Sequence, residues 1–232
     1  MKHSHPGICF FGYEPLENQY KVLFIPSQVH RVEQACQVFT LGDPKEKQWK
    51  NIQNIEPLYP SLRFCSHVFI DGAIYFLVSI KVNKTTEYKV ARFDVRYEKF
   101  YHVDAPKTLT LMALGWYLIN YQGKLGLICC EQRMEIWVME DAEKKTQRWS
   151  KIFFYEMEGF DDWLISNVTR AGEIVFFNEP RDTLRICYYD PKRNSVRYVD
   201  LKDSYPEERG RDKALHIKTF PDYAENTMCL YK

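Results

Sequence analysis

Two adjacent carboxylates, Asp161 and Asp162, stand directly before Trp163 and are the most enzyme-like pair in the sequence. Glycoside hydrolysis uses two carboxylates that flank the scissile bond. Adjacent residues of an extended chain point to opposite sides, however, so these two are poorly placed to act on one bond. We therefore expect a solvated loop here. A propeller-type hydrolase is the alternative, and it would need carboxylates contributed by several distant segments.

Other residue types that carry chemistry form no recognisable constellation. Cys129 and Cys130 are adjacent, but they follow Leu-Gly-Leu-Ile in an expected strand, where packed thiols are inert. His3 and His5 stand near the N-terminus without further metal ligands. The chain has no Gly-x-Ser-x-Gly, no His-Glu-x-x-His, no glycine-rich phosphate loop and no zinc-ligand spacing. We expect no enzyme activity, no cofactor and no bound metal.

The composition is that of an ordinary globular protein. The 232 residues include 32 Lys+Arg and 31 Asp+Glu, which gives a net charge of +1 and no electrostatic reason to expect nucleic acid or a membrane as a partner. The longest mostly apolar stretch, 109–119, is shorter than the roughly 20 residues of a membrane-spanning helix. Seven cysteines without a Cys-x-x-Cys pair, and no secretory signal, predict reduced thiols and a location in the cytoplasm or nucleus.

Four segments repeat one pattern, in which an apolar run and an acidic residue precede a short charged stretch, an aromatic residue and a second apolar run. These segments are 38–52, 90–103, 136–152 and 186–201. The pattern predicts a β-hairpin whose acidic residue caps the turn. The acidic residues are Asp43, Asp94, Asp141 and Asp190. The aromatics, which we expect to pack between blades, recur at spacings of 51, 49 and 49 residues: Trp49, Phe100, Trp149 and Tyr198.

A second marker has the same period. Gly72, Gly123 and Gly172 are spaced by 51 and 49 residues and fit tight turns that need a positive φ. Each period therefore holds two hairpins, and four strands are the unit of a β-propeller blade. We predict an all-β fold: a β-propeller-like array of about four four-stranded blades, of the kelch or WD-repeat kind, either closed or left open. A β-sandwich with accidental spacing is the alternative.

The period also divides the chain and sorts its loops. We expect a flexible N-terminus over 1–9, blades over about 10–55, 64–104, 112–154 and 165–201, and a closing strand within 214–232. Glycine turns and acidic turns should lie at one face, and the longer, variable loops at the other, where binding surfaces are usually carried. Candidate protein-binding residues on the variable loops are Phe160, Asp161, Trp163 and Tyr205. Packing within their own loops is the alternative role for these side chains.

Several segments together resemble the F-box-associated domain of plant F-box proteins, the type 3 F-box associated interaction domain. They include FFGYEPLENQYKVLFI near the start, then FIDGAIYFLVSI, VARFDVRYEKFYHV, LINYQGKLGLI and the terminal FPDYAENTMCLYK. The resemblance runs from about Phe10 to Leu230 in the order that the family uses. Each segment alone is weak, but the combination is specific.

The resemblance implies a non-enzymatic domain that selects the target protein of an SCF-type ubiquitin ligase. In that family an N-terminal F-box docks on a Skp-type adaptor and its cullin, and the associated domain contacts the target. The sequence begins inside the associated domain, so adaptor binding is expected only if an F-box is supplied. A stand-alone interaction module and a truncated relic without adaptor binding are the alternatives.

Overall fold

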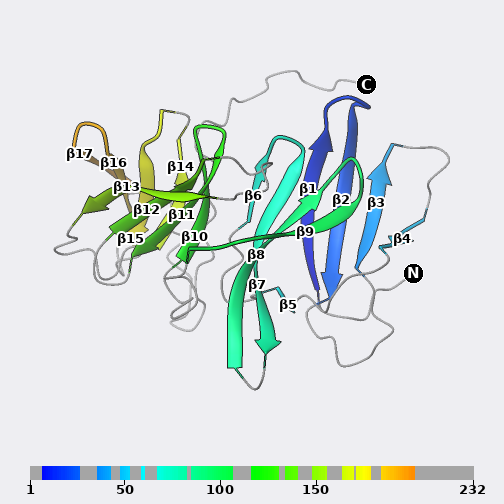
Figure 1. Ribbon diagram of the computed structural model, residues 1–232. Helices are drawn as coiled ribbons and strands as arrows, with labels where there is room; N and C mark the ends of the chain where they lie inside the picture. The colour runs from blue at the N-terminus through cyan, green and yellow to red at the C-terminus, as the bar shows by residue number, and fades with distance from the viewer. Residues whose placement is uncertain are drawn as a thin grey trace, which may run out of the picture. The chain divides into compact units, whose positions relative to one another are not determined.

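Every regular element in the described part of the chain is a β-strand (Figure 1). The computed structural model describes residues 7–26, 36–42, 48–52, 59–60, 67–82, 85–106, 116–130, 134–140, 148–155, 164–169, 171–178 and 184–201. The chain divides into two compact units, Met1–Tyr155 and Glu156–Lys232. The first unit holds three antiparallel sheets and the second holds one. The expected closing strand within 214–232 lies outside the described residues.

The first sheet consists of four strands in sequence order. They are β1 (Gly7–Glu14), β2 (Gln19–Pro26), β3 (Gln37–Leu41) and β4 (Lys50–Asn51). β1 begins at Gly7, which pairs with Pro26, so strand structure starts three residues before the expected boundary at Phe10. Pairing with the full length of β2 explains this extension, because each added residue gains a ladder partner.

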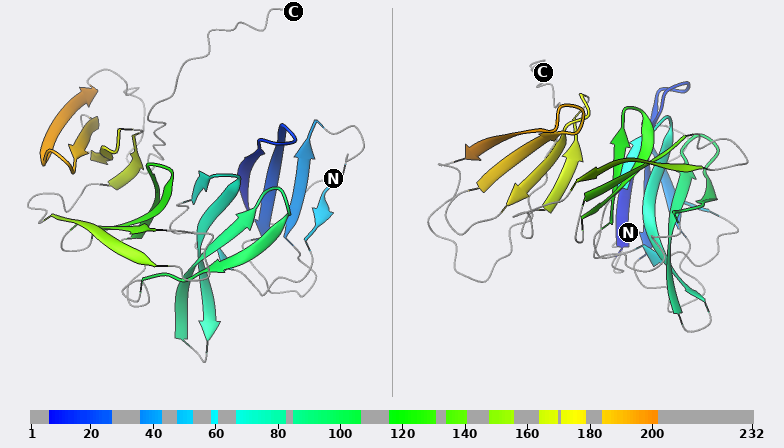
Figure 2. Two further views of the ribbon diagram at one scale, coloured as in Figure 1. Left: turned by 45° about the horizontal axis from the view of Figure 1, so that its top comes forward. Right: turned by 60° about the vertical axis from the view of Figure 1, so that its left-hand side comes forward.

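The second sheet contains the longest hairpin of the described chain. Its strands are β5 (Tyr59–Pro60), β6 (His67–Ile70), β7 (Ala73–Val82), β8 (Thr85–Asp94) and β9 (Lys99–Val103). β5 and β6 both pair with β7, and β9 pairs with β8. β7 and β8 stay paired as far as Val82 and Thr85. The hairpin therefore extends past the strands beside it (Figure 2).

The other two sheets repeat the simple order. In the first unit, the third sheet is built from β10 (Trp116–Tyr121), β11 (Lys124–Cys130), β12 (Met134–Met139) and β13 (Trp149–Tyr155). The second unit has β14 (Leu164–Val168), β15 (Ile174–Asn178), β16 (Leu184–Asp190) and β17 (Ser195–Leu201). Four antiparallel sheets of at least four strands each confirm the predicted all-β, blade-like architecture.

Within the first unit the second sheet is buried on both faces. Even-numbered residues of β7, such as Ile74 and Phe76, pack against the first sheet around Leu23, while Tyr75 and Leu77 pack with residues of the third sheet. This follows from the two-residue alternation of a strand between two apolar layers. The apolar alternation that predicted strands thus also supplies the two cores of the unit.

The glycine turns adopt the conformation that the sequence predicts. Gly72, Gly123 and Gly172 have φ values of 73°, 82° and 90°. A methyl group added at Gly72 would meet no atom within 4 Å, so the requirement there is the positive φ alone. The backbone N–H of Val95 donates to the carbonyl of Gly72 at 2.9 Å, which places a glycine turn and an acidic turn at the same end of the second sheet.

Candidate interaction surfaces

The sequence predicts four protein-binding residues, all on the variable loops. Phe160, Asp161, Trp163 and Tyr205 all lie outside the described residues. The connections between the predicted blades at 53–58, 156–163 and 202–213 also lie outside the described residues. The four candidate residues therefore stay predictions. The sites described below lie on the strands and at the hairpin turns of the sheets.

Three hairpin turns are built on the same plan around an acidic residue. The carboxylate of Asp94 accepts hydrogen bonds from the N–H groups of Arg96 and Tyr97 at 3.1 and 3.0 Å. Asp190 caps its turn through the N–H groups of the second and third residues after it, at 2.9 and 3.3 Å. Glu14 does the same in the β1–β2 turn. The capping prediction is confirmed for Asp94 and Asp190, whereas Asp43 and Asp141 lie outside the described residues.

Each of these turns closes on a residue in the left-handed region. Asn18 and Asn194 have φ values of 53° and 49°, and asparagine tolerates this conformation well. The third turn places Glu98 there, with φ 54°, which is unusual for a glutamate. A glutamate at this position therefore needs a further explanation, and the contacts of the Glu98 side chain provide it.

Glu98 joins the second sheet to the first through two lysines. Its Oε1 accepts from Lys21 Nζ of β2, and its Oε2 accepts from Lys50 Nζ of β4, both at 2.7 Å. The side chain of Lys21 is only 7% exposed, so this ion pair is largely shielded from water. Burial raises the pKa of Glu98, but the hydrogen bonds and charges of the two lysines outweigh it and hold the pKa below the ordinary glutamate value.

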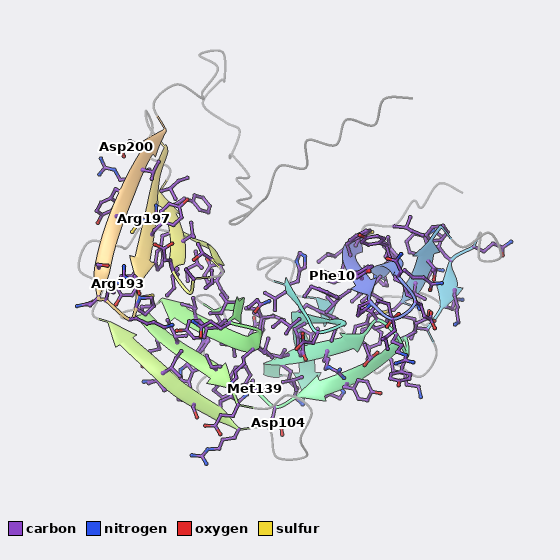
Figure 3. All side chains as sticks on the ribbon, turned by 90° about the horizontal axis from the view of Figure 1, so that it is seen from above. Phe10, Asp104, Met139, Arg193, Arg197 and Asp200 are labelled. Carbon is purple, nitrogen blue, oxygen red and sulfur yellow. The ribbon has the colours of Figure 1, made fainter. Side chains whose placement is uncertain are left out.

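The second unit presents a surface of paired charges and rings along β17, the edge strand of the described sheet. The guanidinium of Arg197 lies 3.6 Å from the centroid of the Tyr188 ring and bonds both carboxylate oxygens of Glu173 at 3.1 Å. Arg185 makes the same kind of pair with Asp200. Figure 3 labels Arg197 and Asp200 on β17. Arginine and tyrosine are the residue types that dominate protein interfaces.

One predicted packing position is wrong at this surface. Phe100 and Trp149 are partly buried against the cores between sheets, as predicted, whereas the printed ring contacts of Trp49 are with Phe24 and Phe39 of its own sheet. Tyr198, at the corresponding place in the last period, is 54% exposed. Its counterparts also lie on or beside edge strands, but Phe100 and Trp149 face the core between two sheets of the first unit, whereas the described part of the second unit holds a single sheet.

The described cysteines have no features of a reactive site. Burial raises the pKa values of Cys36 and Cys187 to about 11, and it also raises the pKa of the exposed Cys9. A thiol with such a pKa is protonated at neutral pH and is a poor nucleophile. Among the described residues, no three His, Cys, Asp or Glu side chains come together in a way that could hold a metal ion. None of the described segments forms a helix long and apolar enough to cross a membrane.

Successive antiparallel sheets of at least four strands, three of them stacked face to face within the first unit, are the repeat architecture of a β-propeller type of protein. Comparison with known families agrees, because the model of the F-box associated beta propeller domain matches residues 1–224. This chain belongs to the F-box-associated β-propeller family. The description of the family associates this domain with the F-box.

The curated relatives are plant proteins whose names contain the words F-box protein. One from Arabidopsis thaliana is 46% identical over 232 residues, which cover 98% of this chain and 60% of the relative. A second Arabidopsis protein is 53% identical over 147 residues, 62% of this chain and 45% of the relative. A third is 37% identical over 239 residues, 99% of this chain and 55% of the relative. The chain thus spans about half to three fifths of the length of these relatives.

Proposed function

We propose that this chain is the non-catalytic, target-binding domain of an F-box protein, and that it selects a protein for ubiquitination by an SCF-type ligase. The observation that carries the proposal is the family match over nearly the whole chain. In this proposal the target binds at the variable loops, through Phe160, Asp161, Trp163 and Tyr205. The domain acts in the cytoplasm or nucleus, which imaging of a fluorescent fusion would test.

The chemistry of the described residues supports a binding role over a catalytic one. The recurring carboxylates Asp94 and Asp190 are engaged in capping their own turns. Glu98 is engaged with two lysines. Catalytic acids and bases need an accessible position and a pKa suited to proton transfer, and these three groups are committed to structural contacts. The proposal therefore assigns ubiquitin transfer to other subunits.

A binding experiment with two forms of the protein separates adaptor docking from target selection. The 232-residue chain, and the same chain fused behind the F-box of a longer relative, are each mixed with a purified Skp-type adaptor. We expect the fusion to bind and the chain alone not to bind. Adaptor binding by the chain alone would contradict the assignment of docking to a separate F-box.

Target selection is then measured in plant cells that express the fusion. Proteins whose ubiquitination rises with the fusion, as read from ubiquitin-remnant peptides, are the expected targets. The double substitution Trp163→Ala and Tyr205→Ala should abolish the rise. Tyr97→Ala is the matched control, because Tyr97 is 62% exposed in the turn between β8 and β9 and does not belong to the segments that carry the candidate residues. Equal ubiquitination profiles with and without the fusion would refute the proposed function.

A further inference from the structure

The turn between β16 and β17 differs from the two other turns of its plan at the positions that the plan leaves open. All three turns begin with a capping carboxylate and end with a residue of positive φ. Only this one carries two adjacent cations, Lys192 and Arg193. The strand after it begins with Ser195, where the other two turns are followed by Gln19 and Lys99. Turn geometry therefore requires neither the two cations nor the serine.

The cations and the serine are all accessible. Lys192, Arg193 and Ser195 are exposed, and the side chain of Arg193 is 83% exposed with a loose ion pair to Asp190 at 3.7 Å. The hydroxyl group of Ser195 has no hydrogen-bond partner among the described residues. An enzyme that modifies this hydroxyl would not have to displace an existing bond.

The placing of these charges before a hydroxyl group occurs once in the chain. Of all its serines and threonines, only Ser195 has a lysine or arginine both two and three residues before it. Ser150 is the nearest comparison within the described strands. It follows Arg148 by two residues, but Gln147 stands at the third position, and its hydroxyl donates to Glu140. Protein kinases select their substrates by such charge patterns, through complementary charges beside their active sites.

We propose that Ser195 is phosphorylated by a serine/threonine kinase that recognises basic residues before its substrate hydroxyl. In this step the Ser195 oxygen bonds to the γ-phosphorus of ATP, the bond from that phosphorus to the bridging oxygen breaks, and ADP leaves. The hydroxyl proton passes to the catalytic aspartate of the kinase. Ser195 pairs with Asp190 at the turn end of the β16–β17 ladder, so the kinase needs to open only the end of the hairpin.

Phosphorylation would change the charge of this end of β17. Lys192, Arg193 and Asp190 together carry one net positive charge, and a phosphoryl group adds about two negative charges. Arg197 lies two residues along the same strand and therefore on the same side as Ser195 (Figure 3). It now bonds both carboxylate oxygens of Glu173 at 3.1 Å. The phosphoryl oxygens would compete with this carboxylate for the guanidinium.

Phosphorylation of the full 232-residue chain by the catalytic domain of a basophilic serine/threonine kinase, with Mg²⁺ and ATP, tests this proposal. The modified sites are read by mass spectrometry after cleavage at acidic residues. We expect Ser195 to react at least about tenfold faster than Ser150. Arg193→Gln should slow the reaction of Ser195 at least about tenfold, because one of the two cations is lost. Arg148→Gln is the matched control, since Arg148 is also exposed and pairs loosely with an acid, Glu140, at 3.9 Å. It should leave the rate at Ser195 unchanged.

A synthetic peptide of residues 188–199 separates the charge pattern from the fold. The folded chain should be phosphorylated at a rate within about tenfold of the peptide, because the turn is exposed. A peptide that reacts while the chain does not would show that the hairpin shields the hydroxyl, and would overturn the proposal. Equal rates at Ser195 and Ser150 would overturn it as well. So would an unchanged rate in Arg193→Gln, once circular dichroism has shown that this variant is folded.

Discussion

Replacing Glu98 by glutamine measures how strongly the first two sheets are tied together. Glu98→Gln keeps the shape of the side chain and removes the charge that bridges Lys21 and Lys50. The three groups differ in their access to water: the side chains of Lys21, Glu98 and Lys50 are 7%, 13% and 59% exposed. The effect of the substitution should therefore come mainly from Lys21.

The magnitude follows from this difference in exposure. The exposed Lys50 ammonium regains water when it loses its partner, so its share is at most about 0.5 kcal/mol. The buried Lys21 ammonium is left with a neutral acceptor, and weakening the pairing of a buried charge costs about 1 to 3 kcal/mol. We expect the free energy that holds β2 against the β8–β9 turn to fall by about 2 kcal/mol. Both glutamate and glutamine would have the same strained φ at residue 98, so the cost of this strain cancels when the stabilities of the wild type and Glu98→Gln are compared.

Hydrogen exchange followed by mass spectrometry is the assay, because it reports the opening of β2 and β9 separately from the second unit. A loss of about 2 kcal/mol corresponds to exchange that is roughly 30-fold faster. Lys50→Gln, the control, should change the rate about twofold. Adding Lys21→Met to Glu98→Gln should recover part of the protection, because the buried ammonium that lost its charged partner is then removed. Less than about threefold acceleration by Glu98→Gln would refute the reasoning.

The pH dependence of the same bridge has a definite sign. The folded-state pKa of Glu98 lies below its ordinary value, because the two lysines outweigh the effect of burial. The bridge therefore contributes its full stability above the unfolded pKa of about 4.3, and the contribution is lost as the pH falls through the lower folded value. Protection of β2 and β9, measured relative to the intrinsic exchange rate at each pH, should fall on acidification below about pH 4 in the wild type. Glu98→Gln should lack this component.

Three further outcomes follow from local geometry. Gly72→Ala should destabilise the first unit by about 1 kcal/mol in urea denaturation through its positive φ alone, and an unchanged midpoint would contradict this cause. Asp190→Ala should cost about 1 kcal/mol by removing two turn hydrogen bonds, seen as a lower melting temperature, whereas Asp190→Asn should retain most of the stability. At pH 8, iodoacetamide should modify Cys9 in the native protein and leave Cys36 and Cys187 unmodified, as read by peptide mass spectrometry. Equal native labelling of all three would contradict their burial.

Features that depend on short stretches of chain were predictable from the sequence. The alternation of apolar residues identified the strands, because one face of each must meet a core. The need for a positive φ identified Gly72, Gly123 and Gly172, and the capping chemistry of carboxylates identified Asp94 and Asp190. The period of these markers, more than any single one, indicated stacked four-stranded sheets.

Features that depend on how the sheets meet were not predictable. The bridge from Glu98 to Lys21 joins residues 77 positions apart, and no local pattern distinguishes these charges from others on the surface. Phe11 and Tyr198 are exposed, although phenylalanine and tyrosine are buried at other strand positions such as Phe76 and Tyr75. Whether such a residue is covered depends on the neighbour of its strand or sheet, which periodicity does not specify.

The strand order of the sheets has a consequence for synthesis. Every described ladder except that between β5 and β7 joins strands adjacent in the chain, so each sheet needs only its own short stretch of polypeptide. Contacts between near neighbours form quickly, and nascent chains emerge at roughly 5 to 20 residues per second. Each blade can therefore assemble on the ribosome before the next has left the exit tunnel. A ribosome that pauses between blades would delay their stacking without leaving a half-made sheet.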